Sequence, residues 1–217
     1  MKINTNILTI DNIFLTDEKS REGYSRFAFF QKRVIDFSFS SLLLISTIPV
    51  MLYTIHRIRK ESPGTIFFTQ PRVGLDGKSF TCYKFRSMHE NMEFNPYTED
   101  SDPRIFPFGR LMRKMRIDEL PQLWNVIRGD MHLIGPRAEW DILVNKYEKT
   151  IPKYQKRHLV RPGITGLAQV LYPYGRNITD ARKKLKYDLL YIERWSMLLE
   201  LKVIWKTIMV VLGRKGV

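Results

Sequence analysis

The strongest constraint on this chain is a largely apolar segment of 22 residues, Val34–Ile55, whose only charged residue is Asp36. A helix of about 20 apolar residues can cross a bilayer. Pro49 lies well inside the segment, where proline removes one helical hydrogen bond and clashes with the preceding turn. A helix over residues 34–48 would rise about 22 Å at ~1.5 Å per residue, short of the ~30 Å hydrocarbon core. The sequence therefore favours a helix that breaks at Pro49.

Cations flank this segment at both ends. Lys32 and Arg33 precede it, and Arg57, Arg59 and Lys60 follow it. Because Lys and Arg mark the cytoplasmic side of a membrane segment, both ends favour the same face. We therefore predict that residues 31–60 form a re-entrant membrane hairpin. A membrane-spanning helix and a buried helix of a soluble core are the alternatives.

The predicted hairpin divides the chain into three regions. Residues 1–30 are polar, without a strong period, and are expected to be an N-terminal extension. Residues 61–217 are expected to form a cytoplasmic or interfacial catalytic domain. At the break itself, the hydroxyls of Ser46 and Thr47 could donate to carbonyls that Pro49 leaves without a helical partner.

The remaining pattern predicts an α+β fold, mostly helical with a small β-hairpin. The hairpin combines strands at Thr65–Thr69 and Ser79–Phe85 with turn residues between them. Helices are expected at 109–116, 119–127, 138–158 with an interruption near Pro152, 179–194, and Met197–Leu212. The last of these suits a helix in the membrane interface, with plain core packing as the alternative.

Charge limits the class of partner. The chain has 36 Lys and Arg residues against 22 acidic residues, a net charge of +14. Such a surplus favours a polyanionic partner: nucleic acid, anionic lipid or a phosphorylated substrate. The four histidines are scattered without metal-ligand spacing, so no zinc or haem site is predicted. The single cysteine, Cys82, excludes an intrachain disulfide and is expected to be a small buried hydrophobe.

One carboxylate pair, Asp118 and Glu119, lies among cations. Arg110, Arg113, Lys114 and Arg116 precede it, and a Gly-Pro-Arg turn ending at Arg137 follows it. An acidic pair is more often the first turn of a helix, where the helix dipole favours negative charge. Beside guanidinium groups, however, a carboxylate can attack phosphorus or hold magnesium while the arginines bind phosphate oxygens. The loop that begins Arg161-Pro-Gly is a second candidate phosphate site, because glycine lets backbone approach closely.

Six motifs in order carry a family resemblance: Lys32-Arg-Val-Ile-Asp, Phe68-Thr-Gln-Pro-Arg-Val-Gly, Tyr83-Lys-Phe-Arg-Ser-Met, Asp118-Glu-Leu-Pro-Gln-Leu-Trp-Asn-Val-Ile-Arg-Gly-Asp-Met, Gly135-Pro-Arg, and Arg161-Pro-Gly-Ile-Thr-Gly-Leu-Ala-Gln-Val. Together they resemble the bacterial sugar transferase family, the small monotopic polyprenyl-phosphate phosphoglycosyl transferases. The similarity covers about residues 31–217.

The resemblance implies a two-step transfer at the cytoplasmic face of the bacterial inner membrane. Asp118 would attack the sugar-linked phosphate of a UDP-sugar, release UMP and hold the phosphosugar as an ester. Polyprenyl (undecaprenyl) phosphate would then accept the phosphosugar, which starts the assembly of an exopolysaccharide or another glycan. Mg²⁺ would offset diphosphate charge with Asp118 as its protein ligand. Glu119 would support Asp118, its partner in the carboxylate dyad, by transferring a proton or by positioning the metal.

The resemblance also assigns substrate-binding roles to cations. Contacts to phosphates or the nucleotide are implied for Arg113, Arg137, Arg161, Arg176, Lys84 and Arg86. Lys84 lies on a predicted strand and Arg86 directly follows it, and charged side chains on a strand face are more often solvated. Membrane lipids are implied as further partners, and a homodimer is left open.

The chain departs from the family pattern in three places. Ile48 rather than serine precedes Pro49, and Ala138 rather than proline follows Arg137. Arg116 occupies a position where a small hydroxyl residue is common. None of these departures removes a proposed catalytic group.

Two other classes of protein would account for the charge. A nucleic-acid-binding protein would use the positive surface, but no recognisable binding module is present and the apolar segment would have no purpose, so no nucleic-acid partner is expected. A non-catalytic membrane scaffold needs only an anchor and cations for anionic lipid. In a protein of that class, Asp118 and Glu119 would have no function.

Overall fold

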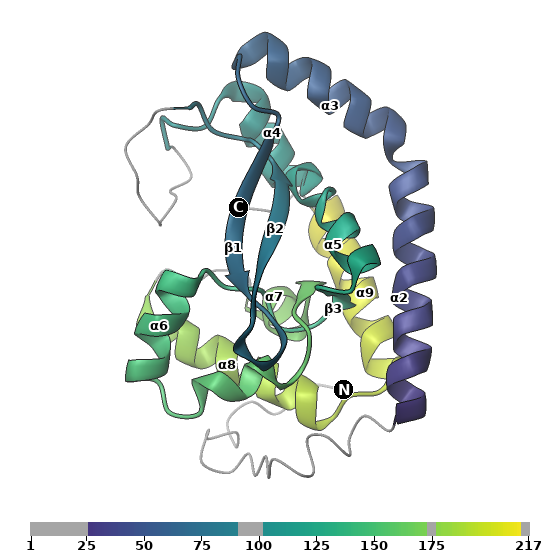
Figure 1. Cartoon of the computed structure of the whole chain (residues 1–217), viewed down its shortest axis with the longest axis vertical. Helices are drawn as coiled ribbons and strands as arrows, with labels where there is room; N and C mark the ends of the chain where they lie inside the picture. The colour runs from purple at the N-terminus through teal and green to yellow at the C-terminus, as the bar shows by residue number, and fades with distance from the viewer. Residues whose placement is uncertain (1–25, 91–101, 173–176, 214–217) are drawn as a thin grey trace.

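The computed structural model describes residues 26–90, 102–172 and 177–213 (Figure 1). The helices are α2 (Arg26–Ser46), α3 (Ile48–Glu61), α4 (Pro107–Met115), α5 (Gln122–Arg128), α6 (Asp141–Thr150), α7 (Leu167–Leu171), α8 (Ile178–Glu193) and α9 (Met197–Leu212). The strands are β1 (Phe67–Val73), β2 (Ser79–Phe85), β3 (His132–Ile134) and β4 (Gly163–Thr165). Helices dominate and the sheets are small, which confirms the predicted α+β class. Helix α2 begins at Arg26, inside the region expected to be an extension; residues 1–25 lie outside the described ranges.

Helices α2 and α3 form one bent arm along one side of the molecule and over its top (Figure 1). The two helices meet at an angle of 57°, and the break falls at Thr47. Pro49 is the second residue of α3, where its missing N–H costs no helical bond. Among the described residues no single helix is long and apolar enough to cross a membrane, whereas this bent pair meets that standard jointly. The helix therefore breaks at Thr47, two residues before the predicted position at Pro49.

Hydroxyl groups satisfy the backbone at this break. The Ser46 hydroxyl donates to the Leu43 carbonyl over 3.0 Å. The Thr47 hydroxyl donates to the carbonyls of Leu43 and Leu44 over 2.7 and 3.2 Å. Both hydroxyls therefore bond to the turn before the break. Neither of these bonds reaches the Ile45 carbonyl, which Pro49 frees, so the role expected of the two hydroxyls at that carbonyl is not confirmed.

The arm buries polar side chains and exposes apolar ones, which is the opposite of the pattern in a helix of a soluble protein. Lys32, Asp36 and Ser40, spaced four residues apart on α2, are each at most 1% exposed. Large apolar side chains point outward instead, with Phe30 and Ile45 each 66% exposed. A helix buried in a soluble core would hide its apolar side, so that alternative does not describe this arm.

The predicted β-hairpin is present. Strands β1 and β2 pair antiparallel in continuous register from Phe67 opposite Phe85 to Val73 opposite Ser79. Strand β1 runs four residues further than expected, and a tight turn at residues 74–78 closes the hairpin. Gly77 in this turn has φ of +73°, a conformation that glycine adopts without strain. Strand β2 carries Lys84, whose side chain is 17% exposed.

A second sheet was not predicted. Strands β3 and β4 pair parallel, with His132 opposite Gly163. Each strand has only three residues, too few for a periodic signal. A Cβ on Gly163 would lie 2.1 Å from the Gly135 nitrogen, so this glycine allows the close approach of the two loops that were singled out as candidate phosphate sites.

Two apolar clusters support these elements. The larger one gathers around α8, where Leu185, Leu189 and Tyr191 are at most 1% exposed. The smaller one includes Ile58, Phe85, Phe106, Phe108 and Met112 and lies where α3 and α4 meet β2. The segment between α4 and α5, which holds the carboxylate pair, begins beside the smaller cluster.

Candidate active site

The carboxylate pair lies on a short turn between two helices. Helix α4 ends at Met115, and the capping residue Arg116 adopts the left-handed backbone conformation with φ of 59°. A 3₁₀ turn over Ile117–Glu119 follows, and α5 begins only at Gln122. Asp118 and Glu119 are 8% and 6% exposed. The pair is therefore buried in a turn of its own, and it does not form the acidic first turn of α5.

Three cations converge on one oxygen of Glu119. Its Oε1 accepts a hydrogen bond from Lys84 Nζ over 3.1 Å, and it lies 3.4 Å from Arg137 Nη1 and 3.6 Å from Arg116 Nη1. Burial by itself raises the pKa of Glu119, but Lys84, Arg137 and Arg116 outweigh burial and lower the pKa below its usual value. Glu119 is therefore a fixed anion that neutralises part of a cationic cluster.

Asp118 has the opposite electrostatic setting. Its Oδ1 is buried and has no hydrogen-bond partner within the described ranges. Burial and the adjacent negative charge of Glu119 raise the pKa of Asp118 to about 6. Arg113, whose Nε donates to the Ser87 hydroxyl over 3.1 Å, acts against this rise through its charge. Asp118 thus holds an unused oxygen and a pKa close to neutrality, as a nucleophile or base requires.

The predicted substrate-binding cations separate into two groups. Lys84 and Arg137 contact Glu119 directly, and Arg113 lies close enough for its charge to act on Asp118.

Arg86 and Arg161 are placed elsewhere. Arg86 is 5% exposed and donates to the Thr65 carbonyl, the Ser62 hydroxyl and the Ser62 carbonyl, so it ties the end of β2 to the end of α3. Arg161 donates through Nε to the Gly129 carbonyl over 2.7 Å. Arg176 lies outside the described residues.

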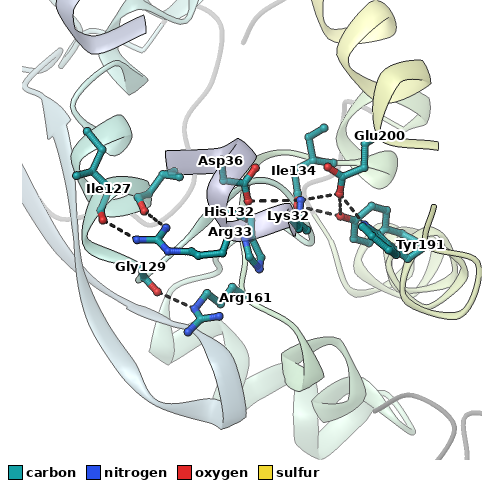
Figure 2. Close-up of polar contacts among 12 residues, drawn as sticks. Lys32, Arg33, Asp36, Ile127, Gly129, His132, Ile134, Arg161, Tyr191 and Glu200 are labelled. Carbon is teal, nitrogen blue, oxygen red and sulfur yellow. Dashed lines mark hydrogen bonds and ion pairs between the residues drawn. The ribbon is translucent and has the colours of Figure 1, made fainter. Parts of the chain in front are cut away.

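A buried polar cluster, which the sequence did not predict, joins α2 to β3 and α9 (Figure 2). Lys32 Nζ donates to Glu200 Oε1 over 2.6 Å and lies 3.5 Å from Asp36 Oδ2. The Tyr191 hydroxyl contacts the same Glu200 oxygen at 2.7 Å, and His132 Nδ1 lies 2.5 Å from Asp36 Oδ2. Charged residues four apart in an apolar run are the signal that could have indicated this cluster, because buried charges are paired.

Arg33 joins the same helix to the site. Its guanidinium donates to the carbonyls of Val126 and Ile127 at the C-terminal end of α5 (Figure 2). Helix α5 follows the carboxylate pair directly, so Arg33 connects the arm to the segment that carries Asp118. The two cations used above as markers of the cytoplasmic side, Lys32 and Arg33, are therefore engaged inside the protein.

Metal ligands are sparse at the site. Among the residues that the structure describes, no group of three or more His, Cys, Asp or Glu side chains could hold a metal ion. Glu119 is occupied by cations, whereas the free Oδ1 of Asp118 is a suitable oxygen ligand. Magnesium is commonly held by one or two carboxylates together with substrate phosphates. The residues present fit a magnesium ion of that kind, and not one held by the protein alone.

A family model settles the class of protein. The model described as bacterial sugar transferase matches residues 27–214. The chain belongs to the bacterial sugar transferase family. Relatives at 38–43% identity include enzymes named as undecaprenyl-phosphate sugar phosphotransferases, so this chain belongs to a family that contains such transferases.

Three relatives show how similar this sugar transferase chain is to members of its family and how much of their length it covers. It is 43% identical over 189 residues to a UDP-N-acetylgalactosamine-undecaprenyl-phosphate N-acetylgalactosaminephosphotransferase of Aeromonas hydrophila, with 86% of this chain and 45% of the relative covered. It is 40% identical to the uncharacterized sugar transferase EpsL of Bacillus subtilis, with 86% and 89% covered. It is 40% identical to a UDP-glucose:undecaprenyl-phosphate glucose-1-phosphate transferase of Klebsiella pneumoniae, with 82% and 39% covered. The chain thus spans less than half of two of these relatives.

Proposed function

We propose that this chain transfers a sugar-1-phosphate from a UDP-sugar to polyprenyl (undecaprenyl) phosphate through a covalent phosphosugar on Asp118. The proposal rests on the difference between the two carboxylates. Nearby cations keep Glu119 ionised, whereas Asp118 has an unpartnered Oδ1 within the described ranges and a pKa of about 6. A carboxylate with such a pKa is mostly ionised at pH 7 and can still act as a leaving group. The relatives' names supply the donor and acceptor classes.

The reaction divides into two displacements at one phosphorus atom. An Asp118 oxygen forms a bond to the sugar-linked phosphorus as the bond from that phosphorus to the UMP oxygen breaks, and UMP leaves. An oxygen of polyprenyl phosphate then bonds to the same phosphorus as the Asp118–phosphorus bond breaks. Lys84, Arg113 and Arg137 stabilise the negative charge that gathers on the phosphoryl oxygens during both steps.

Magnesium belongs to the same proposal. Asp118 would hold the ion together with the donor's phosphates, and the ion would offset diphosphate charge when bound. Glu119 supports Asp118 by fixing the cations around it, since its own Oε1 is taken up by Lys84 and Arg137. This role leaves the buried Asp118 Oδ1 without a protein partner within the described ranges, so that this oxygen remains available as a ligand or nucleophile.

The bent arm supports a membrane location. Its outer face is apolar and its inner face holds the buried charges, as expected for a helix between protein and lipid. We assign residues 31–60 to a re-entrant membrane hairpin and residues 61–217 to a catalytic domain at the cytoplasmic face of the bacterial inner membrane. Exposed Trp124 on α5 and Trp205 on α9 support contact with the membrane interface. The chain would thereby start an exopolysaccharide or another glycan on a lipid carrier.

Intact-protein mass spectrometry tests the proposal. Purified protein is incubated with magnesium and, in separate samples, UDP-glucose, UDP-galactose and their N-acetylated forms, without lipid. We expect a hexose-phosphate adduct and release of UMP with at least one donor, because the first displacement needs no acceptor. Asp118→Asn should form no adduct, whereas Arg128→Gln, outside the site, should load normally. Substantial turnover by Asp118→Asn would contradict the assignment of the nucleophile.

A further inference from the structure

Strand β2 has one edge that no other strand covers within the described part of the chain. Strand β1 pairs with the opposite edge along its whole length, from Phe67 opposite Phe85 to Val73 opposite Ser79. An open edge presents backbone N–H and C=O groups without strand partners. Helix α5 lies beside this edge (Figure 1), and one of its side chains binds the backbone of β2.

Asn125 is the side chain that fills this place. It is fully buried, at 0% exposure. Its Oδ1 accepts a hydrogen bond from the Tyr83 backbone N–H over 3.1 Å, and its Nδ2 donates to the Thr81 carbonyl over 2.7 Å. The same Nδ2 donates to Asp130 Oδ2 over 3.0 Å. The amide therefore pairs with alternate residues of β2 as a neighbouring strand would, and Asp130 holds the amide in the orientation that this pairing needs.

The same two segments meet again at the carboxylate pair. Glu119, in the turn that leads into α5, accepts a hydrogen bond from Lys84 Nζ over 3.1 Å. This is the shortest of its contacts with the three cations around it. Lys84 directly follows Tyr83 on β2. The place of Lys84 relative to the two carboxylates therefore depends on how α5 sits along β2, and the Asn125 amide fixes that position at the adjacent residue.

We propose that Asn125 is a positioning residue of the active site, whose amide docks α5 on the open edge of β2 and thereby places Lys84 beside Asp118 and Glu119. A primary amide suits this task because it carries a donor and an acceptor on one short, planar group. A carboxylate could not donate to the Thr81 carbonyl, and an apolar side chain would leave two buried backbone groups unpaired. The inference rests on the proposed function for the reaction that this geometry serves.

Lys84 needs such a restraint from its backbone. Its ammonium group is a point charge on a flexible four-carbon stem, so the side chain by itself does not fix where the charge stands. An error of about 1 Å in the placement of a site group can slow an enzyme about 100-fold. Loss of the Asn125 amide should therefore reduce the rate of the reaction in a protein that is still folded.

The loading reaction with UDP-sugar and magnesium, without lipid, tests this role. Asn125→Leu keeps the approximate size of the side chain and removes both hydrogen-bonding groups. We expect release of UMP to slow at least about tenfold. Val144→Ala is the control for lost stability, because Val144 is 2% exposed in the larger apolar cluster and lies on α6. Well below its melting temperature, this control should load as wild type does. Normal loading by Asn125→Leu would overturn the proposal.

A double-mutant cycle with Lys84→Met separates positioning from general damage. Slow loading is followed over hours by intact-protein mass spectrometry. If Asn125 acts by placing Lys84, then Asn125→Leu should slow loading by less than about twofold once Lys84 is absent, because the two effects are not additive. Two losses that multiply would overturn the proposal, since Asn125 would then act independently of Lys84.

Acylation of lysine side chains, read by peptide mass spectrometry, tests the same placement without turnover. The Lys84 side chain is 17% exposed and that of Lys32 is 1% exposed. We expect an amine-reactive ester to modify Lys84 faster in Asn125→Leu than in wild type, while Lys32 stays protected as a measure of the intact fold. An unchanged rate at Lys84 would overturn the proposal.

A second variant and the labelling experiment keep the inference testable by itself. If Asn125→Leu does not fold, Asn125→Asp/Asp130→Asn takes its place: it keeps an acceptor for Tyr83 and a hydrogen bond between positions 125 and 130, and loses the donor to Thr81. The same changes in loading and labelling are expected. If wild type forms no phosphosugar adduct with any donor, the proposed function fails, whereas the labelling rates still decide whether Asn125 places Lys84.

Discussion

Lys32 and Glu200 form a buried ion pair, with 2.6 Å between Lys32 Nζ and Glu200 Oε1, across 168 residues of sequence (Figure 2). The pair fastens the first helix of the bent arm to α9 at the other end of the described chain. The same carboxylate also accepts a hydrogen bond from Trp195 Nε1 over 2.8 Å. Loss of one partner would leave an uncompensated charge in a dry interior, which is the costly way to break such a pair.

We expect Lys32→Met to lower the free energy of unfolding by about 3–5 kcal/mol. The reason is that Glu200 would keep its charge without its counterion. The double variant Lys32→Met/Glu200→Gln should recover part of this loss, because Glu200 no longer carries an unpaired charge and only Asp36, which also contacts His132, still lacks its cation. Thermal melting in detergent would measure both. The control is Arg128→Gln, which removes a partly exposed ion pair with 3.4 Å between Arg128 Nε and Asp130 Oδ2 and should cost at most about 1 kcal/mol. Equal melting temperatures for Lys32→Met and wild type would show that the pair is not buried in solution.

Asp118 should make the protein less stable as pH rises. Its folded pKa of about 6 lies above the ordinary value of 3.8, so the folded state holds a proton that the unfolded state has already released between those values. Stability due to this group is complete below about pH 4 and is lost as pH rises through about 6. Asp118→Asn should therefore be more stable than wild type at pH 8, by up to about 3 kcal/mol, with the gain vanishing below pH about 4.

Glu119→Gln supplies the matched control for this pH experiment. The pKa of Glu119 is lowered by its cations despite burial, so its stabilising effect is present above the unfolded pKa and lost as pH falls. This variant should be less stable than wild type at pH 8, opposite in sign to Asp118→Asn. Denaturant unfolding at pH 4 and pH 8 measures both. A shift of the same sign in the two variants would contradict the division of roles within the dyad.

Arg137→Lys tests whether the planar guanidinium group of Arg137 is required for donor loading. Arg137 presents both terminal nitrogens to Glu119 Oε1, at 3.4 and 3.5 Å, and lysine keeps the charge without this fork. Donor loading should slow at least about tenfold, whereas Arg128→Lys should load as wild type does. Rapid-quench measurement of UMP release gives the rate. Nearly full loading with a lowered melting temperature would mean that Arg137 only holds the loop in place.

The two ends of the arm should face the same side of the membrane. Gln31 and Pro63 are exposed just before and just after the apolar segment, so cysteines at these positions can react with a thiol reagent. In intact cells, an impermeant maleimide should label neither Gln31→Cys nor Pro63→Cys, and both should react once the membrane is opened. Cys82 is buried and serves as an unlabelled background. Labelling of residue 31 alone in intact cells would favour a spanning helix.

Local chemistry in the sequence determined much of this protein. The break at Pro49, the β-hairpin and helix α9 follow from proline sterics, alternation and apolar periodicity, which act over a few residues and need no knowledge of distant neighbours. The sequence also singled out the dyad with Lys84, Arg113 and Arg137, because cations near a carboxylate pair are visible in linear order and in the family's motifs.

Only the tertiary structure decided which cations meet which carboxylate. Arg86 and Arg161 are predicted phosphate ligands, and the structure shows that they also donate to the backbone carbonyls of Ser62 and Gly129. Arg161 Nη1 is left without a partner within the described residues. Conversely, the buried contacts of Lys32 with Glu200 and of Asp36 with His132 form only when α9 and β3 pack against α2. Charge interactions depend on distance and on exclusion of water, and both are set by packing between segments far apart in the chain.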